Sequence, residues 1–198
     1  MSNVVSTERA LALLREWTAN ESLVKHGLAV GFCVGRVASA SALDRGWGKQ
    51  ETEKLVELYQ CAGFLHDFDY DRHPTQEEHP FVGVAYLREQ GWPEEMLHAI
   101  LAHADYSGVV PETHLDKALF ACDELAGFLT ACALVKPSKK IADVEVAGVK
   151  KKMKDKAFAR AVKREDILRG AEMLEISVEE HIWNCLAAMQ EHAAELGL

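Results

Sequence analysis

The stretch from residue 55 to residue 74 constrains the fold more than any other part of the chain. Its first half carries apolar side chains at a spacing of three and four, namely Leu55, Leu58, Tyr59, Ala62 and Leu65. That period is typical of one buried face of a helix. The apolar run stops at His66-Asp67, and an aspartate-rich loop continues to Pro74. We therefore expect a core helix that presents a histidine and an aspartate at its carboxyl end.

A histidine beside an aspartate at a helix end also has a purely structural interpretation. The aspartate would accept a hydrogen bond, and the histidine would cap the last carbonyl groups of the helix. The pair alone does not decide between this interpretation and a functional site. The decision depends on the other polar residues of the chain.

Composition favours helices throughout the 198 residues, because there are only five prolines and thirteen glycines, and no useful segment has the period of a strand. We predict an all-α protein of about eight to ten helices in a single domain, 1–198. The expected helices lie at about 7–17, 21–41, 50–67, 80–89, 93–103, 114–135, two short ones within 138–164, 165–175 and 178–196. Within 21–41, Gly27, Gly31 and Gly35 form a stripe of small residues, which lets a second helix approach closely, so we expect this helix to be central.

Several classes of protein are disfavoured. No run of eighteen apolar residues is present, so we expect no membrane span. The first residues lack the basic and apolar regions of a signal peptide, which makes a cytoplasmic location the expectation. The five cysteines form no Cys-x-x-Cys pair, so we predict reduced core residues and not zinc ligands.

The charge of −9 is unevenly distributed. The segment 136–164 has eleven Lys and Arg against three acidic residues, whereas the rest of the chain has eleven against 28. This basic segment is either a solvated face or a rim that steers anions. It lacks the interleaved aromatic side chains of single-strand binders, and the chain as a whole is acidic, so we expect no nucleic-acid partner.

The polar residues that stand out follow the order His…His-Asp…His…His…Asp, and they are His26, His66, Asp67, His79, His103 and Asp123. This order along an all-α chain resembles the HD-domain superfamily of metal-dependent phosphohydrolases, over about residues 20–135. Leu65–Tyr70 and the basic stretch 149–160 also resemble a small bacterial and archaeal branch with an HD-x-D-Y start. The segment 136–164 and the helices of 165–198 would pack on the HD core.

The resemblance implies that these six residues hold one or two divalent ions. His26, His66, Asp67 and Asp123 would bind one ion, and Asp67 would bridge to a second ion held by His79 and His103. Imidazole and carboxylate ligands without thiolates suit Mn, Fe, Co, Ni, Zn or Mg. Two such ions would clamp a phosphate and activate a water.

The expected catalytic residues are Asp67, as the bridging ligand, and Asp69. Asp69 either donates a proton to the leaving oxygen or orients a ligand histidine. Arg72, Lys151 and Lys154 are the candidate residues for binding the anionic, phosphate-containing substrate; Arg72 would otherwise pair with Asp69. The predicted function is hydrolysis of a small phosphate ester, for example a nucleotide.

Two other functions fit the same residues. Some members of the superfamily hold a di-iron centre and are oxygenases, with the same kinds of ligand. A non-catalytic nucleotide-binding regulatory module is the second alternative. The oligomeric state does not follow from the sequence, because helices that bind a second copy look the same as core helices.

Overall fold

The computed structural model describes residues 5–198, which form ten α-helices, two short 3₁₀ helices and no strand. The all-α prediction is therefore confirmed for the described part of the chain. The elements are Thr7–Trp17 (α1), Glu21–Asp44 (α2), Lys49–Leu65 (α3), Phe81–Glu89 (α4), Glu94–His103 (α5), Asp105–Ser107 (η1), His114–Leu134 (α6), Ile141–Asp143 (η2), Val146–Met153 (α7), Arg164–Met173 (α8), Val178–Glu191 (α9) and Ala193–Leu196 (α10).

Two expected elements differ from the structure. The lysine-rich segment forms one α-helix, α7, and the 3₁₀ helix η2, and turns occupy most of 154–162. There the guanidinium of Arg164 donates to the carbonyl oxygens of Ala159 and Val162, each at 2.6 Å, so a side chain satisfies acceptors that a helix would otherwise pair. The expected helix 178–196 is interrupted at His192, whose ring stacks on Phe32 with centroids 3.7 Å apart.

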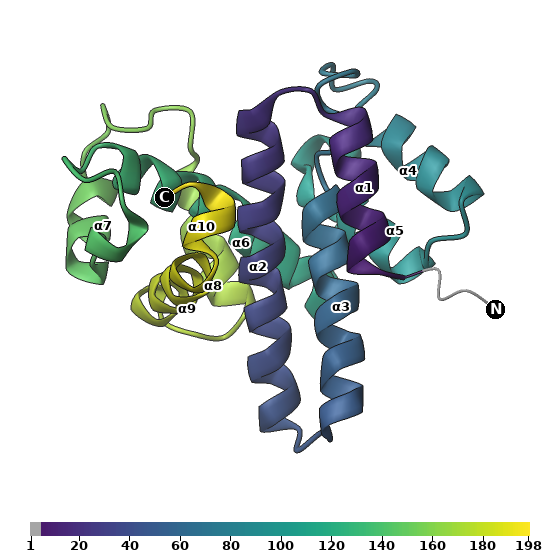
Figure 1. Ribbon diagram of the computed structural model, residues 1–198, viewed down its shortest axis with the longest axis horizontal. Coiled ribbons are helices and arrows are strands. Elements are labelled where there is room, and N and C mark those ends of the chain that lie inside the picture. Colours follow the sequence, from purple (N-terminus) through teal and green to yellow (C-terminus); the bar gives the residue numbers. More distant parts are fainter. Residues whose placement is uncertain (1–4) are drawn as a thin grey trace.

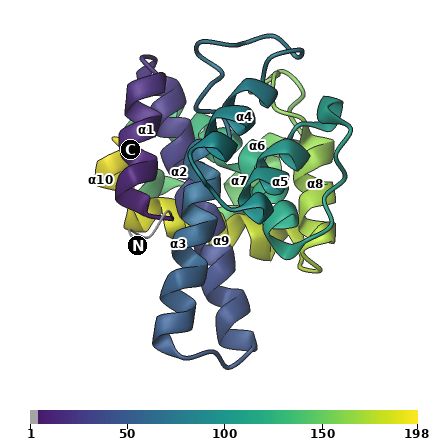
Figure 2. The same cartoon turned by 90° about the vertical axis from the view of Figure 1, so that its right-hand side faces the viewer.

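The long helix α2 is central, as the glycine stripe predicts, and packs against α3, α6 and α9 (Figure 1). Together α2 and α3 form a hairpin whose tip projects beyond the other helices (Figure 2). A Cβ atom added to Gly63 would lie 2.5 Å from the Cα atom of Gly31, so the two helix backbones touch where they cross. This close approach sets the rings of His26 on α2 and His66 after α3 at a centroid distance of 5.2 Å.

By length and composition, α2 is also the one described helix that could cross a membrane. A core helix has the same property, and more than half of the apolar stretch of α2 is buried inside the protein. Burial against three other helices accounts for its apolar composition.

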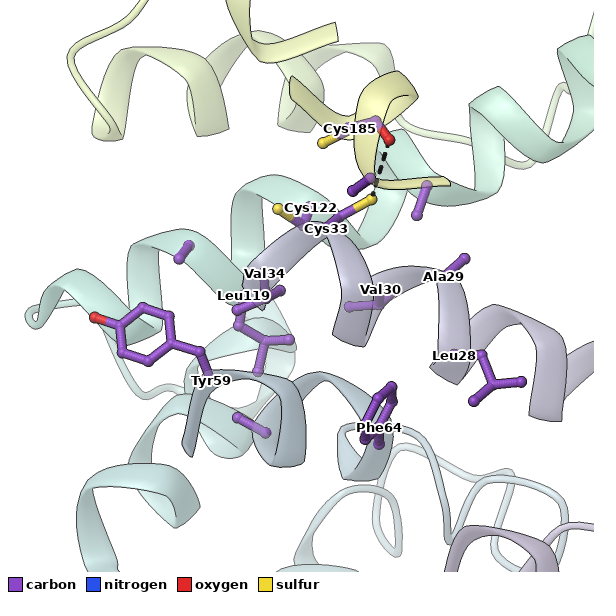
Figure 3. Close-up of a cluster of buried hydrophobic side chains, with 14 of the residues drawn as sticks. Leu28, Ala29, Val30, Cys33, Val34, Tyr59, Phe64, Leu119, Cys122 and Cys185 are labelled. Carbon is purple, nitrogen blue, oxygen red and sulfur yellow. Dashed lines mark hydrogen bonds between the residues drawn. The ribbon is translucent and has the colours of Figure 1, made fainter. Parts of the chain in front are cut away.

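The part of the core that Figure 3 shows joins α2, α6 and α9 and contains three of the five cysteines that belong to the core. All five cysteines are free and buried, as predicted. Cys33 on α2 donates from its thiol to the carbonyl oxygen of Cys185 on α9, at 3.7 Å, and Cys122 on α6 lies beside them. This packing fixes α6, which carries Asp123, against α2, which carries His26.

Candidate metal centre

The loop after α3 is fastened to the start of α2. The hydroxyl of Thr18 donates to the carbonyl oxygen of Phe68 at 3.0 Å. The carboxylate of Asp71 accepts from the backbone N–H groups of Ala19 and Asn20, at 2.8 and 3.0 Å. Because Asn20 caps α2, these bonds fix the His66-Asp67 turn relative to the helix that carries His26.

The structure brings the side chains of all six predicted ligand residues into one cluster, although they come from five helices or helix ends. His26 lies on α2, the pair His66-Asp67 follows α3, His79 precedes α4, His103 ends α5, and Asp123 is in the middle of α6.

Asp67 lies at the centre of this cluster. Its Oδ2 atom is 3.3 Å from Nε2 of His66 and 3.8 Å from Nε2 of His26. Its Oδ1 atom is 3.1 Å from Nε2 of His79 and 3.4 Å from Nε2 of His103. The two oxygens of one carboxylate therefore face two different pairs of histidines.

Asp123 completes one side of the cluster. Its Oδ1 atom lies 2.9 Å from Nε2 of His26 and 3.5 Å from Nε2 of His66. The ligand atoms of His26, His66 and Asp123 all lie within 4.8 Å of one another, and so do those of His66, Asp67 and His103. Both groups could hold a metal ion.

Three histidines are oriented by bonds from their Nδ1 atoms. His66 donates to the carbonyl oxygen of Gly63 at 2.8 Å, and His103 donates to that of Ile100 at 2.5 Å. His79 donates to Oδ1 of Asp69 at 2.7 Å. Since these bonds place the proton of each neutral ring on Nδ1, the lone pair of each Nε2 atom points into the cluster.

The Nε2 atom of His66 shows that the cluster fits a cation. It is completely buried, has no hydrogen-bond partner, and faces the carboxylates of Asp67 and Asp123. A buried polar atom without a partner costs free energy, so such atoms call for an explanation such as an ion. Imidazole nitrogens and carboxylate oxygens are suitable ligands for first-row divalent ions.

The carboxylates and histidines shift one another's pKa values. Burial acts to lower the pKa of His66, but the negative charges of Asp67 and Asp123 outweigh it and raise the pKa well above the usual value. Burial also opposes protonation of His79, yet its bonds to Asp67 and Asp69 raise its pKa to about 9. The pKa values of both Asp67 and Asp123 are lowered, because the nearby histidines outweigh the effect of burial. Without metal, protons occupy places that an ion would take.

A pocket of about 360 Å³ opens over the cluster, at the lower end of the roughly 300–1,000 Å³ typical of ligand sites. Its walls include five residues that sequence reasoning missed, namely Asp105, Tyr106, Glu124, Lys163 and Asp166. Glu124 carried a signal as the neighbour of Asp123 in a buried helix, and Lys163 carried one as part of the basic segment 136–164. Burial and the charge of Asp123 raise the pKa of Glu124 to about 7.

The residues expected to bind substrate do not line this pocket. Arg72 donates to the carbonyl oxygen of Glu16 at 2.5 Å and lies over the ring of Trp17, because its loop folds back onto α1. It therefore pairs neither with the pocket nor with the carboxylate of Asp69. Lys151 lines a separate groove beside α7, and Lys154 follows that helix without lining the pocket. Figure 1 shows α7 at the opposite end of the molecule from α4 and α5.

The fold and the site define an all-α protein whose helices surround a cluster of histidines and aspartates that could hold a metal ion. The HD domain family matches residues 24–127, which is more than half of the chain and includes all six residues of the cluster. The chain belongs to the HD domain family. This family is part of a superfamily of metal-dependent phosphohydrolases that act on phosphate-containing substrates.

One curated relative is ribonuclease Y from Desulfotalea psychrophila, with 27% identity over 156 residues. The matched region is 76% of this chain but 27% of that protein, so the chain spans only about a quarter of the relative's length. No solved structure matches the chain at a significant level.

Proposed function

We propose that this protein is a metal-dependent phosphohydrolase that cleaves a small phosphate ester, such as a nucleotide. The observation that carries the proposal is the buried, unpartnered Nε2 atom of His66, which faces two carboxylates beneath an open pocket. In this proposal one divalent ion would be held by His26, His66, Asp67 and Asp123, and a second would be held by Asp67, His79 and His103.

The proposed ions would neutralise phosphate oxygens and lower the pKa of a bound water, so that a nucleophile is available near neutral pH. The protein's own contribution is orientation. Backbone carbonyls fix the rings of His66 and His103, and Asp69 fixes the ring of His79. The pocket gives the substrate access to this one side of the cluster, while His66 stays buried below it.

The role proposed for Asp69 is to position His79. Both of its carboxylate oxygens are occupied, since Oδ1 accepts from His79 and Oδ2 accepts from the backbone N–H of Gly83 at 2.8 Å. Asp69 does not line the pocket, so it is poorly placed to reach a leaving group. Of the two roles expected from the sequence, its contacts support orientation over proton donation.

A second candidate substrate is a phosphodiester in RNA. The similarity to a ribonuclease Y favours it, and the same cluster would serve, because metal-dependent hydrolysis of esters and diesters needs the same kinds of ligand. The acidic pocket walls argue for a small substrate, since a long polyanion would meet Asp105, Glu124 and Asp166.

The proposal is tested with protein that is stripped of metal and reloaded with single divalent ions. Metal content is measured by elemental analysis, and product release is measured for a panel of phosphomonoesters, nucleotides and phosphodiesters. Asp67→Asn should lose activity by on the order of 100-fold or more. Asp44→Asn, an exposed aspartate at the end of α2, should behave as wild type. Fully loaded protein that cleaves nothing in the panel contradicts the proposal.

The same preparations separate the two rival functions. A di-iron oxygenase would retain two irons per chain, give a mixed-valent spectroscopic signal and consume oxygen. A regulatory module would bind a nucleotide tightly without turnover, whichever metal was supplied. Hydrolysis that depends on added metal, without oxygen uptake, favours the phosphohydrolase.

A further inference from the structure

The pocket over the cluster is strongly acidic and contains a single lysine. Its lining carboxylates are Asp67, Asp105, Asp123, Glu124 and Asp166. Among the described residues that line it, Lys163 is the one lysine or arginine. An anionic substrate therefore has one protein cation, other than the histidines, with which to pair.

Lys163 is held in the wall by its backbone while its side chain remains available. Its backbone N–H donates to the carboxylate of Glu124 at 3.2 Å, which fixes the residue beside α6. Its ammonium group lies 3.9 Å from Asp105 and 3.8 Å from Asp166. Both distances exceed the roughly 2.7–2.9 Å of a charge-assisted hydrogen bond, and the side chain is 63% exposed, so these two contacts bind it weakly.

Both carboxylates near Lys163 have a second cation. The guanidinium of Arg169 donates to Asp105 at 2.7 Å and lies 3.6 Å from Asp166. If the ammonium group turned toward an anion in the pocket, neither carboxylate would be left without a cation. The move would therefore cost little.

The wall that carries Lys163 is rigidly attached to the cluster. Helix α8, which begins at the next residue, packs on α6 so closely that a Cβ atom on Gly170 would lie 2.5 Å from the Cα atom of Ala121. Ala121 is two positions before Asp123 on the same helix. This wall lies outside residues 24–127, the part of the chain that matches the HD domain family.

We propose that Lys163 binds the phosphate of the substrate from the part of the pocket wall that precedes α8. This role of Lys163 rests on the proposed function, and it also narrows the class of substrate. Asp67 and Asp123 are proposed metal ligands, so in metal-loaded protein the carboxylates that further phosphates would face are Asp105, Glu124 and Asp166. One lysine beside these three suits a substrate with one phosphate group and disfavours nucleoside di- and triphosphates.

The test compares Lys163→Gln with Lys156→Gln in metal-loaded protein. Lys156 is an exposed lysine of the same basic segment and does not line the pocket, so its variant controls for the loss of one positive charge. Binding of inorganic phosphate is measured by calorimetry, and kcat and KM are measured for a nucleoside monophosphate and the matching triphosphate. Circular dichroism and melting confirm that the variants are folded.

Lys163→Gln should weaken phosphate binding and raise KM by about tenfold, with little change in kcat, as expected for the loss of one charge-assisted hydrogen bond. Lys163→Arg should restore much of the affinity, and Lys156→Gln should leave it unchanged. The wild-type protein should prefer the monophosphate by about tenfold or more in kcat/KM.

Unchanged phosphate affinity and KM in Lys163→Gln overturn the assignment of Lys163, as does a metal-loaded wild-type protein that binds no phosphate. A preference for the triphosphate overturns the limit to one phosphate. If phosphate binding depends on Lys163 while no ester is cleaved, the proposed hydrolysis fails and the phosphate site stands. If hydrolysis proceeds equally well in Lys163→Gln, the phosphate site fails and the proposed hydrolysis stands.

Discussion

Asp69 accepts a hydrogen bond of 2.7 Å from Nδ1 of His79, and Asp69 is only 1% exposed. The bond leaves the Nε2 atom of His79 facing Asp67 at 3.1 Å. A buried carboxylate that fixes the ring of a ligand histidine acts through that histidine. This relationship yields a direct test of the two roles that the sequence left open for Asp69.

Asp69→Asn should weaken metal binding on the side of His79 and His103 by about 10–100-fold, because the ring of His79 loses its fixed orientation. Metal affinity is measured by competition with a chelator of known affinity. The pH dependence of kcat should keep its shape. Loss of its alkaline limb, with metal content unchanged, would instead indicate that Asp69 is the proton donor. Asp44→Asn serves as the matched control.

Metal loading should release protons near neutral pH. His79 has a pKa of about 9 in the metal-free protein, so at pH 7 it carries a proton that an ion must displace. We expect the release of about one proton or more per chain at pH 7, decreasing as the pH rises above 9. Calorimetry in two buffers with different ionisation enthalpies measures it.

His79→Gln should release fewer protons than wild type in the same experiment. Equal release from the two proteins would show that His79 is not protonated in the metal-free state.

The raised pKa of His79 also fixes how the stability of the fold depends on pH. In metal-free protein the contribution of protonated His79 is fully present below the unfolded pKa of about 6.5 and is lost as pH rises through about 9.

Gly63→Ala should destabilise the fold, because its Cβ atom would meet the backbone of Gly31 at 2.5 Å and the two helices would have to separate. Overpacking of this kind typically costs about 1–3 kcal/mol, measured by urea unfolding. Separation would also move His26 away from His66, so metal affinity should fall. Gly148→Ala on α7 is the matched control, since its Cβ atom would meet nothing within 4 Å.

In that control, the higher helix propensity of alanine should raise the free energy of unfolding by up to about 1 kcal/mol. A Gly63→Ala protein as stable as wild type would mean that α2 and α3 do not cross as closely as described.

The free energy of unfolding should fall in acid because of the buried side chain of His181. Burial lowers its pKa, although the bond from its Nε2 atom to the carbonyl oxygen of Ala121 acts against the shift. The unfolded chain therefore binds a proton that the folded chain does not, so the contribution of neutral His181 is present above a pH of about 6.5 and decreases as the pH falls below it.

The measurement is the urea-unfolding free energy of wild type and His181→Gln between pH 5 and pH 7.5. The difference in favour of wild type should shrink toward pH 5, because glutamine does not titrate. A difference independent of pH would show that His181 protonates equally in both states.

Local patterns in the sequence were sufficient for most of the helices, whereas the members of the cluster followed from the order of histidines and aspartates along the chain and its resemblance to the HD-domain superfamily. The three-and-four spacing before His66 predicts α3, and the stripe of Gly27, Gly31 and Gly35 predicts the close crossing of α2. The His and Asp residues stand out because such side chains are rare in apolar helices unless they are paired or bind a metal. Each of these signals depends on neighbours within a few positions of the chain.

Only the tertiary structure decided which histidines face each oxygen of Asp67 and which residues line the pocket over the cluster. The two oxygens of Asp67 face different histidine pairs because histidines from four separate parts of the chain converge on it, and no local pattern encodes that geometry. The sequence favoured Lys151 and Lys154, because a count of charges along the chain does not tell which lysine side chains face the pocket. The structure places Lys163 in the pocket instead, because α8 folds back onto α6 two positions before Asp123.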